Sequence, residues 1–138
     1  MISDSTLIDT VEIASELRNI TEVEKLIDRI CELKSINEDL YGNMLIAVTE
    51  AVNNAVIHGN CFQKDQLVHI TVSDFVDKIC FVVKDHGKGF DFSNLPDPTS
   101  PENIEKENGR GIFLIKNLAD ELVFEDGGTK AVIYFNHG

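Results

Sequence analysis

The chain has 138 residues, the length of one domain, and its 43% hydrophobic residues, 26% charged residues and only three prolines argue against disorder. Its formal net charge of −12 at pH 7 argues against a surface for nucleic acid or an anionic membrane, because both need clustered Lys and Arg. More than half of this charge lies in the first 50 residues. That region is typical of a solvated helix face, and an acidic docking surface for a basic partner segment is the alternative.

Cysteines and apolar runs indicate the compartment. Cys31, Cys61 and Cys80 are spaced too widely for a CxxC motif, and an odd number is typical of reduced thiols. We expect them to be small core residues. No charged and then apolar leader opens the chain, and no apolar run approaches the roughly 18 residues of a membrane span. We therefore expect a cytoplasmic protein without a membrane anchor.

The first part of the chain predicts a strand and two helices. Residues 6–14 alternate partly between apolar and polar side chains, which predicts a strand that could lie at a sheet edge. Ser15 can cap a helix that runs to about Leu33 with its apolar residues on one side. Asn37, followed by two acids, caps the next helix, and Gly59, a residue free to adopt a positive φ, ends it.

Strand-like segments then follow at residues 67–73 and 79–84, close enough for a hairpin. Residues 92–108 contain all three prolines and no apolar periodicity, which is typical of a lid or a binding loop. A helix begins at residues 109–111.

Two further strands, residues 121–125 and 130–135, are joined by a turn at Gly127-Gly128. We find no internal repeat, linker or second domain, so residues 1–138 are expected to form one domain. The order of elements predicts an α/β (α+β) two-layer sandwich, with a mostly antiparallel mixed sheet and helices on one face.

The helix that contains Glu50 is the element around which the rest of the chain is organised. At about 100° per residue, Glu50, Asn54 and His58 form a polar row beside an apolar arc. An acid and an amide beside a half-buried surface carry a desolvation cost unless they are paired or bind something. Glu50 and Asn54 are therefore the first functional candidates, and a capped or solvated helix face is the alternative.

Two glycine-rich segments lie on other elements. Asp85-x-Gly87-x-Gly89 follows a predicted strand directly, and Gly109-Arg110-Gly111 opens a predicted helix. The sequence contains no G-x-x-x-x-G-K-[ST], which excludes a P-loop. The second segment lacks the third glycine and the preceding strand of a Rossmann fingerprint.

Together, in this order and spacing, these elements resemble the motifs of the Bergerat-fold (GHKL) ATPases, the superfamily of gyrase B, Hsp90, MutL and the histidine kinases. Glu50-x-x-x-Asn54 resembles the N box, Asp85-x-Gly87-x-Gly89 the G1 box, Gly109-Arg110-Gly111 the G2 box, and Gly128-Thr129 the terminal Gly-Thr. Each motif alone is a weak signal. Their combination predicts a Bergerat ATP-binding fold with a lid at about residues 92–108.

Within this superfamily the chain is most similar to the anti-sigma-factor serine/threonine kinases of the RsbW/SpoIIAB type. The phrases TEAVNNAVIHGN and GRGIFLIK carry the resemblance, which extends over nearly the whole chain. It implies an ATP- and Mg²⁺-dependent kinase that phosphorylates an anti-anti-sigma (STAS-type) protein, binds a sigma factor and forms a homodimer. A histidine kinase would need an upstream phosphoacceptor helix pair, and gyrase-like, MutL-like or Hsp90-like proteins a downstream transducer domain.

The resemblance also implies roles for the helix residues. Mg²⁺ prefers oxygen ligands and takes only one or two protein groups beside the phosphates, which suits the amide oxygen of Asn54 as metal ligand. Glu50, one turn earlier, would orient the attacking hydroxyl and accept its proton as general base.

Asp85 would accept a hydrogen bond from the adenine amino group, while Gly87 and Gly89 would let the backbone approach the ring closely. Taken alone, this segment is more often a polar turn. Thr129 could support the adenine site through its hydroxyl, and a strand-edge threonine is the alternative.

The phosphates would lie at the start of the last helix. Gly109 and Gly111 leave free N–H groups accessible there, and Arg110 could add a positive charge or be simply exposed. His58 could contact a phosphate or only pack at the helix end. Lys106, in the expected lid, could reach the γ-phosphate or be solvated.

Two other functions remain open at this stage. The chain could bind nucleotide and sequester a partner as a regulatory module without phosphotransfer, or it could be the ATP-hydrolysing module of a larger machine.

Overall fold

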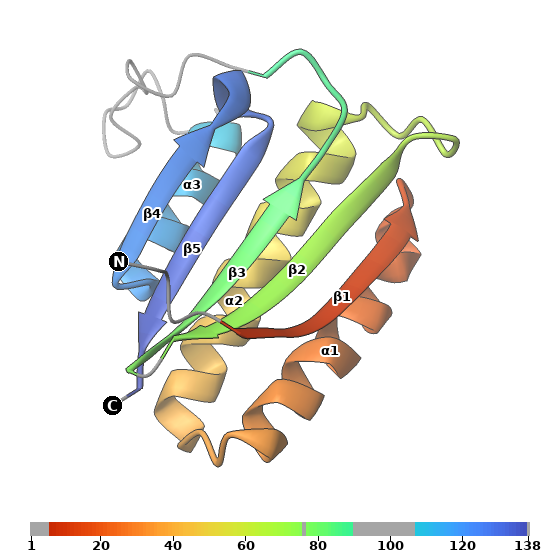
Figure 1. Cartoon of the computed structure of the whole chain (residues 1–138). Helices are drawn as coiled ribbons and strands as arrows, with labels where there is room; N and C mark the ends of the chain where they lie inside the picture. Colours follow the sequence, from red (N-terminus) through yellow and green to blue (C-terminus); the bar gives the residue numbers. More distant parts are fainter. Residues whose placement is uncertain (1–5, 76, 90–106, 138) are drawn as a thin grey trace.

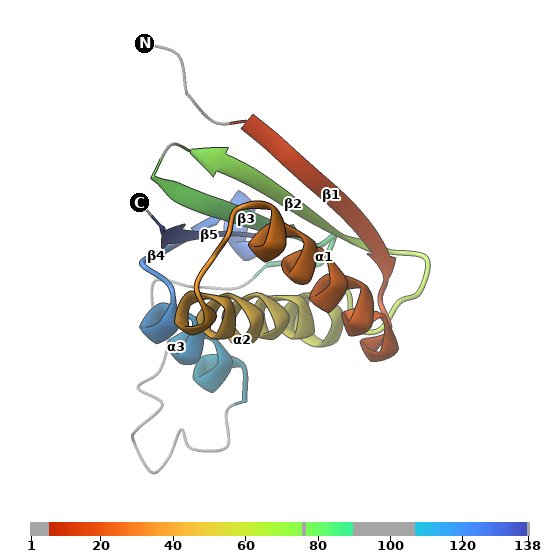
Figure 2. The same cartoon turned by 90° about the horizontal axis from the view of Figure 1, so that it is seen from below.

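The computed structural model describes residues 6–75, 77–89 and 107–137, and for residues 107–110 it describes the backbone alone. Strands form one sheet, and the helices lie together on one of its faces (Figure 1, and from below in Figure 2). The predicted two-layer α+β architecture is therefore confirmed.

The sheet has five strands in the order β1-β2-β3-β5-β4. These are β1 (Thr6–Ala14), β2 (Leu67–Phe75), β3 (Lys78–Lys84), β4 (Glu121–Glu125) and β5 (Lys130–Asn136). Every neighbouring pair among these described strands is antiparallel, so they contain no parallel pair of the kind that a mixed sheet requires. β1 lies at a sheet edge, as its partial alternation allowed.

In the described part of the chain, three α-helices cover one face of the sheet: α1 (Ile20–Leu33), α2 (Glu38–Asn54) and α3 (Glu107–Leu118). α2 lies between the other two and packs against both (Figure 2). The side chain of Asn37 accepts a hydrogen bond from the backbone N–H of Leu40 at 2.9 Å, which confirms the predicted N-cap of α2.

Ser15 does not cap a helix. A short 3₁₀ turn, Leu17–Asn19, intervenes before α1. The hydroxyl of Ser15 instead donates to the carbonyl of Gln66 at 2.5 Å and accepts from the side-chain amide of Asn60 at 3.0 Å. A buried serine needs a partner, and here the partners come from segments far along the chain.

Gly59 ends the central helix, but not for the predicted reason. α2 continues into one π-helical turn, Ala55–Gly59, and the described glycines with positive φ are Gly89, Gly127 and Gly128. A β-carbon at Gly59 would lie 2.5 Å from Oδ2 of Asp85. Gly59 is therefore needed for a close approach to Asp85 and not for a left-handed backbone.

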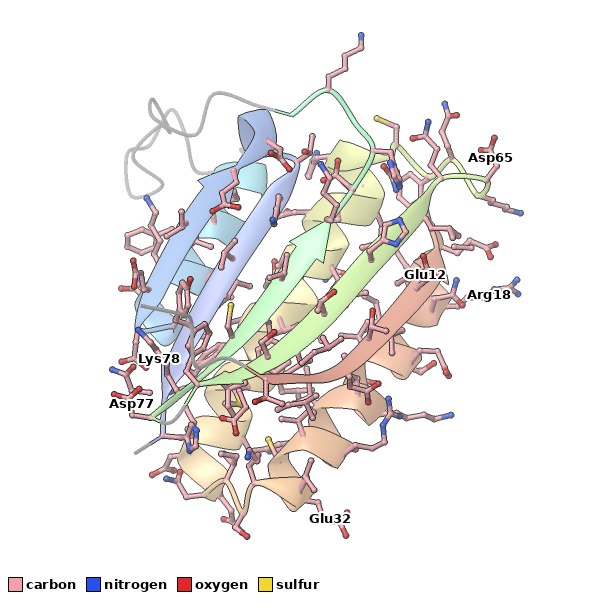
Figure 3. All side chains as sticks on the ribbon, in the orientation of Figure 1. Glu12, Arg18, Glu32, Asp65, Asp77 and Lys78 are labelled. Atoms are coloured by element: carbon pink, nitrogen blue, oxygen red, sulfur yellow. The ribbon has the colours of Figure 1, made fainter. Side chains whose placement is uncertain are left out.

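The core lies between the sheet and the three helices. Along β2, Val68, Ile70 and Val72 are buried toward the helices, while the intervening residues face the other side of the sheet. Exposed charged side chains such as Arg18, Glu32 and Asp65 point away from the body of the protein (Figure 3). No helix in the described part of the chain is long and apolar enough to cross a membrane.

Two other expectations need correction. Cys31 and Cys80 are buried as predicted, whereas Cys61 is exposed because it lies in the loop after the π-helical turn. α3 begins at Glu107, so it starts before Gly109. Residues 92–106 of the predicted lid, with Lys106, lie outside the described residues.

Candidate functional site

A pocket of about 240 Å³ lies between the helices and the sheet. It is formed where the end of α2, the end of β3 and the β4–β5 turn meet, at the upper end of the sheet in Figure 1. The predicted site residues that line it are Asn54, His58, Asp85, Gly89 and Thr129. The rest of its wall is mainly apolar, from Ala51, Ala55, Gly59, Val83, Ile112, Ile115, Phe124, Gly128 and Ala131. Such a pocket suits a flat heteroaromatic ring with one polar edge.

Asp85 provides a carboxylate inside this apolar pocket. It is 8% exposed and follows the last residue of β3. Its Oδ1 accepts a hydrogen bond from the N–H of Gly87 at 2.8 Å, whereas Oδ2 has no hydrogen-bond partner among the residues that the structure describes. Burial raises the pKa of Asp85, and the Gly87 N–H and the neighbouring Lys84 oppose that rise only in part. One oxygen is therefore available to a donor on a ligand.

Glycines around Asp85 permit close contacts between protein segments. A β-carbon at Gly87 would lie 2.6 Å from the carbonyl carbon of Gly59, and one at Gly89 would lie 2.8 Å from that of Gly127. Gly89 also has a φ of +80°, which a residue with a side chain adopts only with strain. Gly87 and Gly89 therefore let the segments that form the pocket's walls pack closely against each other. From the sequence, these two glycines were expected only to let the backbone approach a ligand.

Glu50 and Asn54 face the start of α3. A β-carbon at Gly111 would lie 3.0 Å from Oε2 of Glu50 and 3.4 Å from Oδ1 of Asn54. Both side chains are half-buried, whereas His58, the third member of the polar row, is exposed. The space at Gly111 is bordered by the carboxylate of Glu50 and by both atoms of the Asn54 amide, with Nδ2 at 3.3 Å and Oδ1 at 3.4 Å. The two oxygens are of the kind that a cation bound to phosphates takes as ligands.

Thr129 supports Asp85 through the backbone. Its carbonyl accepts the N–H of Asp85 at 2.9 Å. Its hydroxyl donates to the carbonyl of Asp126 at 3.0 Å and accepts from Nζ of Lys84 at 2.6 Å. The hydroxyl therefore holds the β4–β5 turn that carries Gly127 and Gly128 into the site.

The remaining predicted residues lie at the periphery. His58 is exposed at the rim of the pocket. Gly109 lies in the first turn of α3, where N–H groups have no intrahelical partner, whereas Gly111, two residues later, lies beyond the first four residues of the helix. The side chain of Arg110 lies outside the described part of the structure.

Asn60 is a site residue that the sequence analysis missed. Its side chain is 2% exposed and accepts the N–H of His86, the residue that follows Asp85, at 2.7 Å. A polar residue directly after the glycine that ends the helix was the available signal. It was not sufficient, because its partner lies 26 residues away in the sequence.

Comparison with known proteins shows which family the chain matches and which proteins it is similar to. The chain matches the family described as "Histidine kinase-like ATPase domain" over residues 13–135. It is 38% identical over 94 residues to the serine-protein kinase RsbW of Staphylococcus epidermidis, and 37% identical over 92 residues to that of Staphylococcus aureus strain MRSA252. Each match covers 61% of this chain and 58% of the relative, so the chain spans somewhat more than half the length of these relatives.

The fold is similar to that in the crystal structure of the RsbU and RsbW domains of Rv1364c from Mycobacterium tuberculosis. The TM-score is 0.58 at 15% sequence identity, and the match covers 94% of this chain and 32% of that chain. At this identity the likeness shows a shared fold. The family match includes the pocket, Asp85 and the helix with Glu50 and Asn54, and it extends over nearly the whole sequence. The chain therefore belongs to the histidine kinase-like ATPase domain family.

Proposed function

We propose that this protein is an ATP- and Mg²⁺-dependent serine/threonine kinase and anti-sigma factor, which phosphorylates an anti-anti-sigma (STAS-type) protein and binds a sigma factor. The observation that carries the proposal is the apolar pocket with an oxygen of Asp85 that no described residue hydrogen-bonds, next to the half-buried pair of Glu50 and Asn54. The similarity to the RsbW serine-protein kinases supports the choice of reaction.

Adenine is the base that this pocket suits best. Its exocyclic amino group donates, and an ionised aspartate can only accept. Guanine bound in the same orientation would place a carbonyl oxygen against the carboxylate without a proton between them, and its own N–H donors lie further along the ring edge. We therefore expect the site to favour ATP over GTP, with the ring packed between the apolar side chains of α2, α3 and β5.

Phosphates and metal would lie at the start of α3. The first-turn N–H groups of this helix can donate to phosphate oxygens. Asn54 would be one ligand of Mg²⁺, which when bound neutralises phosphate charge. No group of three or more His, Cys, Asp or Glu that could hold a metal occurs among the described residues, so phosphate oxygens and water would complete its coordination.

Glu50 would act on the acceptor. The serine Oγ of the substrate forms a bond to the γ-phosphorus, the bond from that phosphorus to the β,γ-bridging oxygen breaks, and ADP leaves. The proton of the serine hydroxyl passes to the carboxylate of Glu50. The position of Glu50 beside Gly111, one helical turn from Asn54, supports this assignment.

We also propose that the protein works in the cytoplasm as a homodimer, without direct contact to nucleic acid or membrane. Its net charge of −12 supports the last part, since phosphate-rich surfaces would repel it.

Two measurements test the proposal. Calorimetry with and without Mg²⁺ should show ATP binding to the wild type, a loss of its Mg²⁺ dependence in Asn54→Ala, and weaker binding of GTP. Transfer of labelled γ-phosphate to a purified STAS-type protein should occur with the wild type and fail with Glu50→Ala. A wild type that binds no ATP would refute the proposal, and ATP binding without transfer to any STAS-type partner would reduce the protein to a regulatory module that binds nucleotide.

A further inference from the structure

The buried side chain of Asn60 connects the end of the central helix to three other segments of the chain. Its Nδ2 lies 3.0 Å from the hydroxyl oxygen of Ser15 and 3.2 Å from the carbonyl oxygens of both Gln66 and Leu67. Its Oδ1 accepts the N–H of His86 at 2.7 Å. A buried amide with partners on both ends is held in one orientation, because turning it over would place donor against donor and acceptor against acceptor.

The hydrogen bond to His86 belongs to a series that fixes the backbone around Asp85. Three successive N–H groups, those of Asp85, His86 and Gly87, donate to the carbonyl of Thr129, to Oδ1 of Asn60 and to Oδ1 of Asp85 itself. The first holds the segment to β5 and the third orients the carboxylate within its own turn. Among the described residues, the bond that the N–H of His86 donates to Asn60 is the one hydrogen bond that holds this segment to the helix wall, the side of the pocket formed by the end of α2 and the π-helical turn.

Asn60 also completes that helix wall. Its backbone N–H donates to the carbonyl of Ala55 at 2.7 Å and closes the π-helical turn. Ala55, His58 and Gly59 of this turn line the pocket, and Gly59 lies against the carboxylate of Asp85. The distance between the helix wall and Asp85 is therefore set by two adjacent residues, since Gly59 leaves the space and Asn60 fixes its width.

We propose that Asn60 is a positioning residue for the base-recognition site, which holds Asp85 at the depth where its free oxygen meets the amino group of adenine. The proposal rests on the proposed nucleotide-binding function. It predicts that Asn60 contributes to selectivity between ATP and GTP without touching either nucleotide. If Asn60 served only to fold the loop after the helix, replacing it would lower the stability of the protein and leave the selectivity between ATP and GTP unaltered.

The test compares Asn60→Ala with Ser15→Ala, a matched control. Ser15→Ala removes a hydroxyl from the same buried cluster but leaves the bond between Asn60 and His86 in place. The dissociation constants of ATP and GTP are measured by displacement of a fluorescent nucleotide, and stability by urea denaturation. In Asn60→Ala we expect ATP affinity to fall about tenfold, the size of one lost neutral hydrogen bond, and the selectivity ratio to fall with it. In Ser15→Ala the ratio should stay at the wild-type value.

A further variant, Asn60→Asp, retains an acceptor oxygen for His86 but places a carboxylate against the carbonyls of Gln66 and Leu67, so it should lose stability and keep its selectivity for ATP. The nucleotide constants of both variants are measured with a stabilising osmolyte, under conditions where urea denaturation shows them folded. An unchanged ratio in Asn60→Ala, or an equal change in Ser15→Ala, would overturn the positioning role while the proposed function stands. A wild type that binds no ATP would overturn both.

Discussion

Replacing Asp85 with Asn tests the central contact of the site. The change preserves size and an acceptor for the N–H of Gly87, but it places an amide NH₂ group where the free carboxylate oxygen lies. A hydrogen bond to a charged group contributes about 1.5 to 3 kcal/mol, and leaving two donors facing each other in a buried site costs about 1 to 3 kcal/mol more. Together these terms predict a loss of ATP affinity of a hundredfold or more, since each ~1.4 kcal/mol is a factor of ten.

Stability should change in the opposite direction. Because burial raises the pKa of Asp85, the ionised carboxylate is less favourable in the empty folded protein than in the unfolded chain. Asp85→Asn removes that charge, so its urea midpoint should equal or exceed that of the wild type. Calorimetry with ATP and urea denaturation measure the two effects, with Asp65→Asn as a control at an exposed position (Figure 3). ATP affinity within threefold of wild type in Asp85→Asn would refute the assignment of the base-recognition site.

Other consequences of the geometry can be measured in the same assays. Glu50→Gln should lower phosphate transfer by about a hundredfold or more and leave ATP affinity unchanged; unaltered transfer would remove Glu50 from the mechanism. Gly59→Ala should cost about 1 to 3 kcal/mol of stability and weaken ATP binding, because its methyl group would displace the carboxylate of Asp85. Gly42→Ala in α2, the helix that the turn with Gly59 extends, is its control and should be stabilising by up to ~1 kcal/mol, since a β-carbon there meets nothing within 4 Å; equal losses in both would contradict the steric argument. The stability advantage of Asp85→Asn should shrink as the pH falls through the raised pKa of Asp85, because a protonated aspartate has no charge to desolvate; a pH-independent difference would exclude this cause.

The local sequence pattern was sufficient to predict which helices and strands form, but not where each of them ends. The predicted strand at residues 6–14 coincides with β1, because alternation of side chains is a property of neighbouring residues. Ser15 was predicted to cap a helix, since serine does so often, but its hydroxyl bonds to Gln66 and Asn60. Partners this far along the chain are not visible to an argument from local spacing.

The sequence alone predicted candidate residues for the site, but it did not predict the contacts between them. The motif spacing predicted Glu50, Asn54 and Asp85 as site residues, and the fold brings all three to the region where α2, α3 and the end of β3 meet. Asn60 ends the phrase TEAVNNAVIHGN but was given no role, because an asparagine after a helix-ending glycine usually belongs to an ordinary loop. Its importance comes from complete burial and from His86, neither of which spacing reveals.

The glycines explain why motifs that are weak separately are informative together. Gly59 leaves room for the carboxylate of Asp85, Gly87 for the carbonyl of Gly59, and Gly89 for the backbone of Gly127. Gly59 lies five residues after the N box and Gly127 directly precedes the Gly-Thr segment, so these contacts join the G1 box to residues that flank the other two motifs. The end of the central helix, the G1 box and the β4–β5 turn therefore form a single packing unit around the pocket.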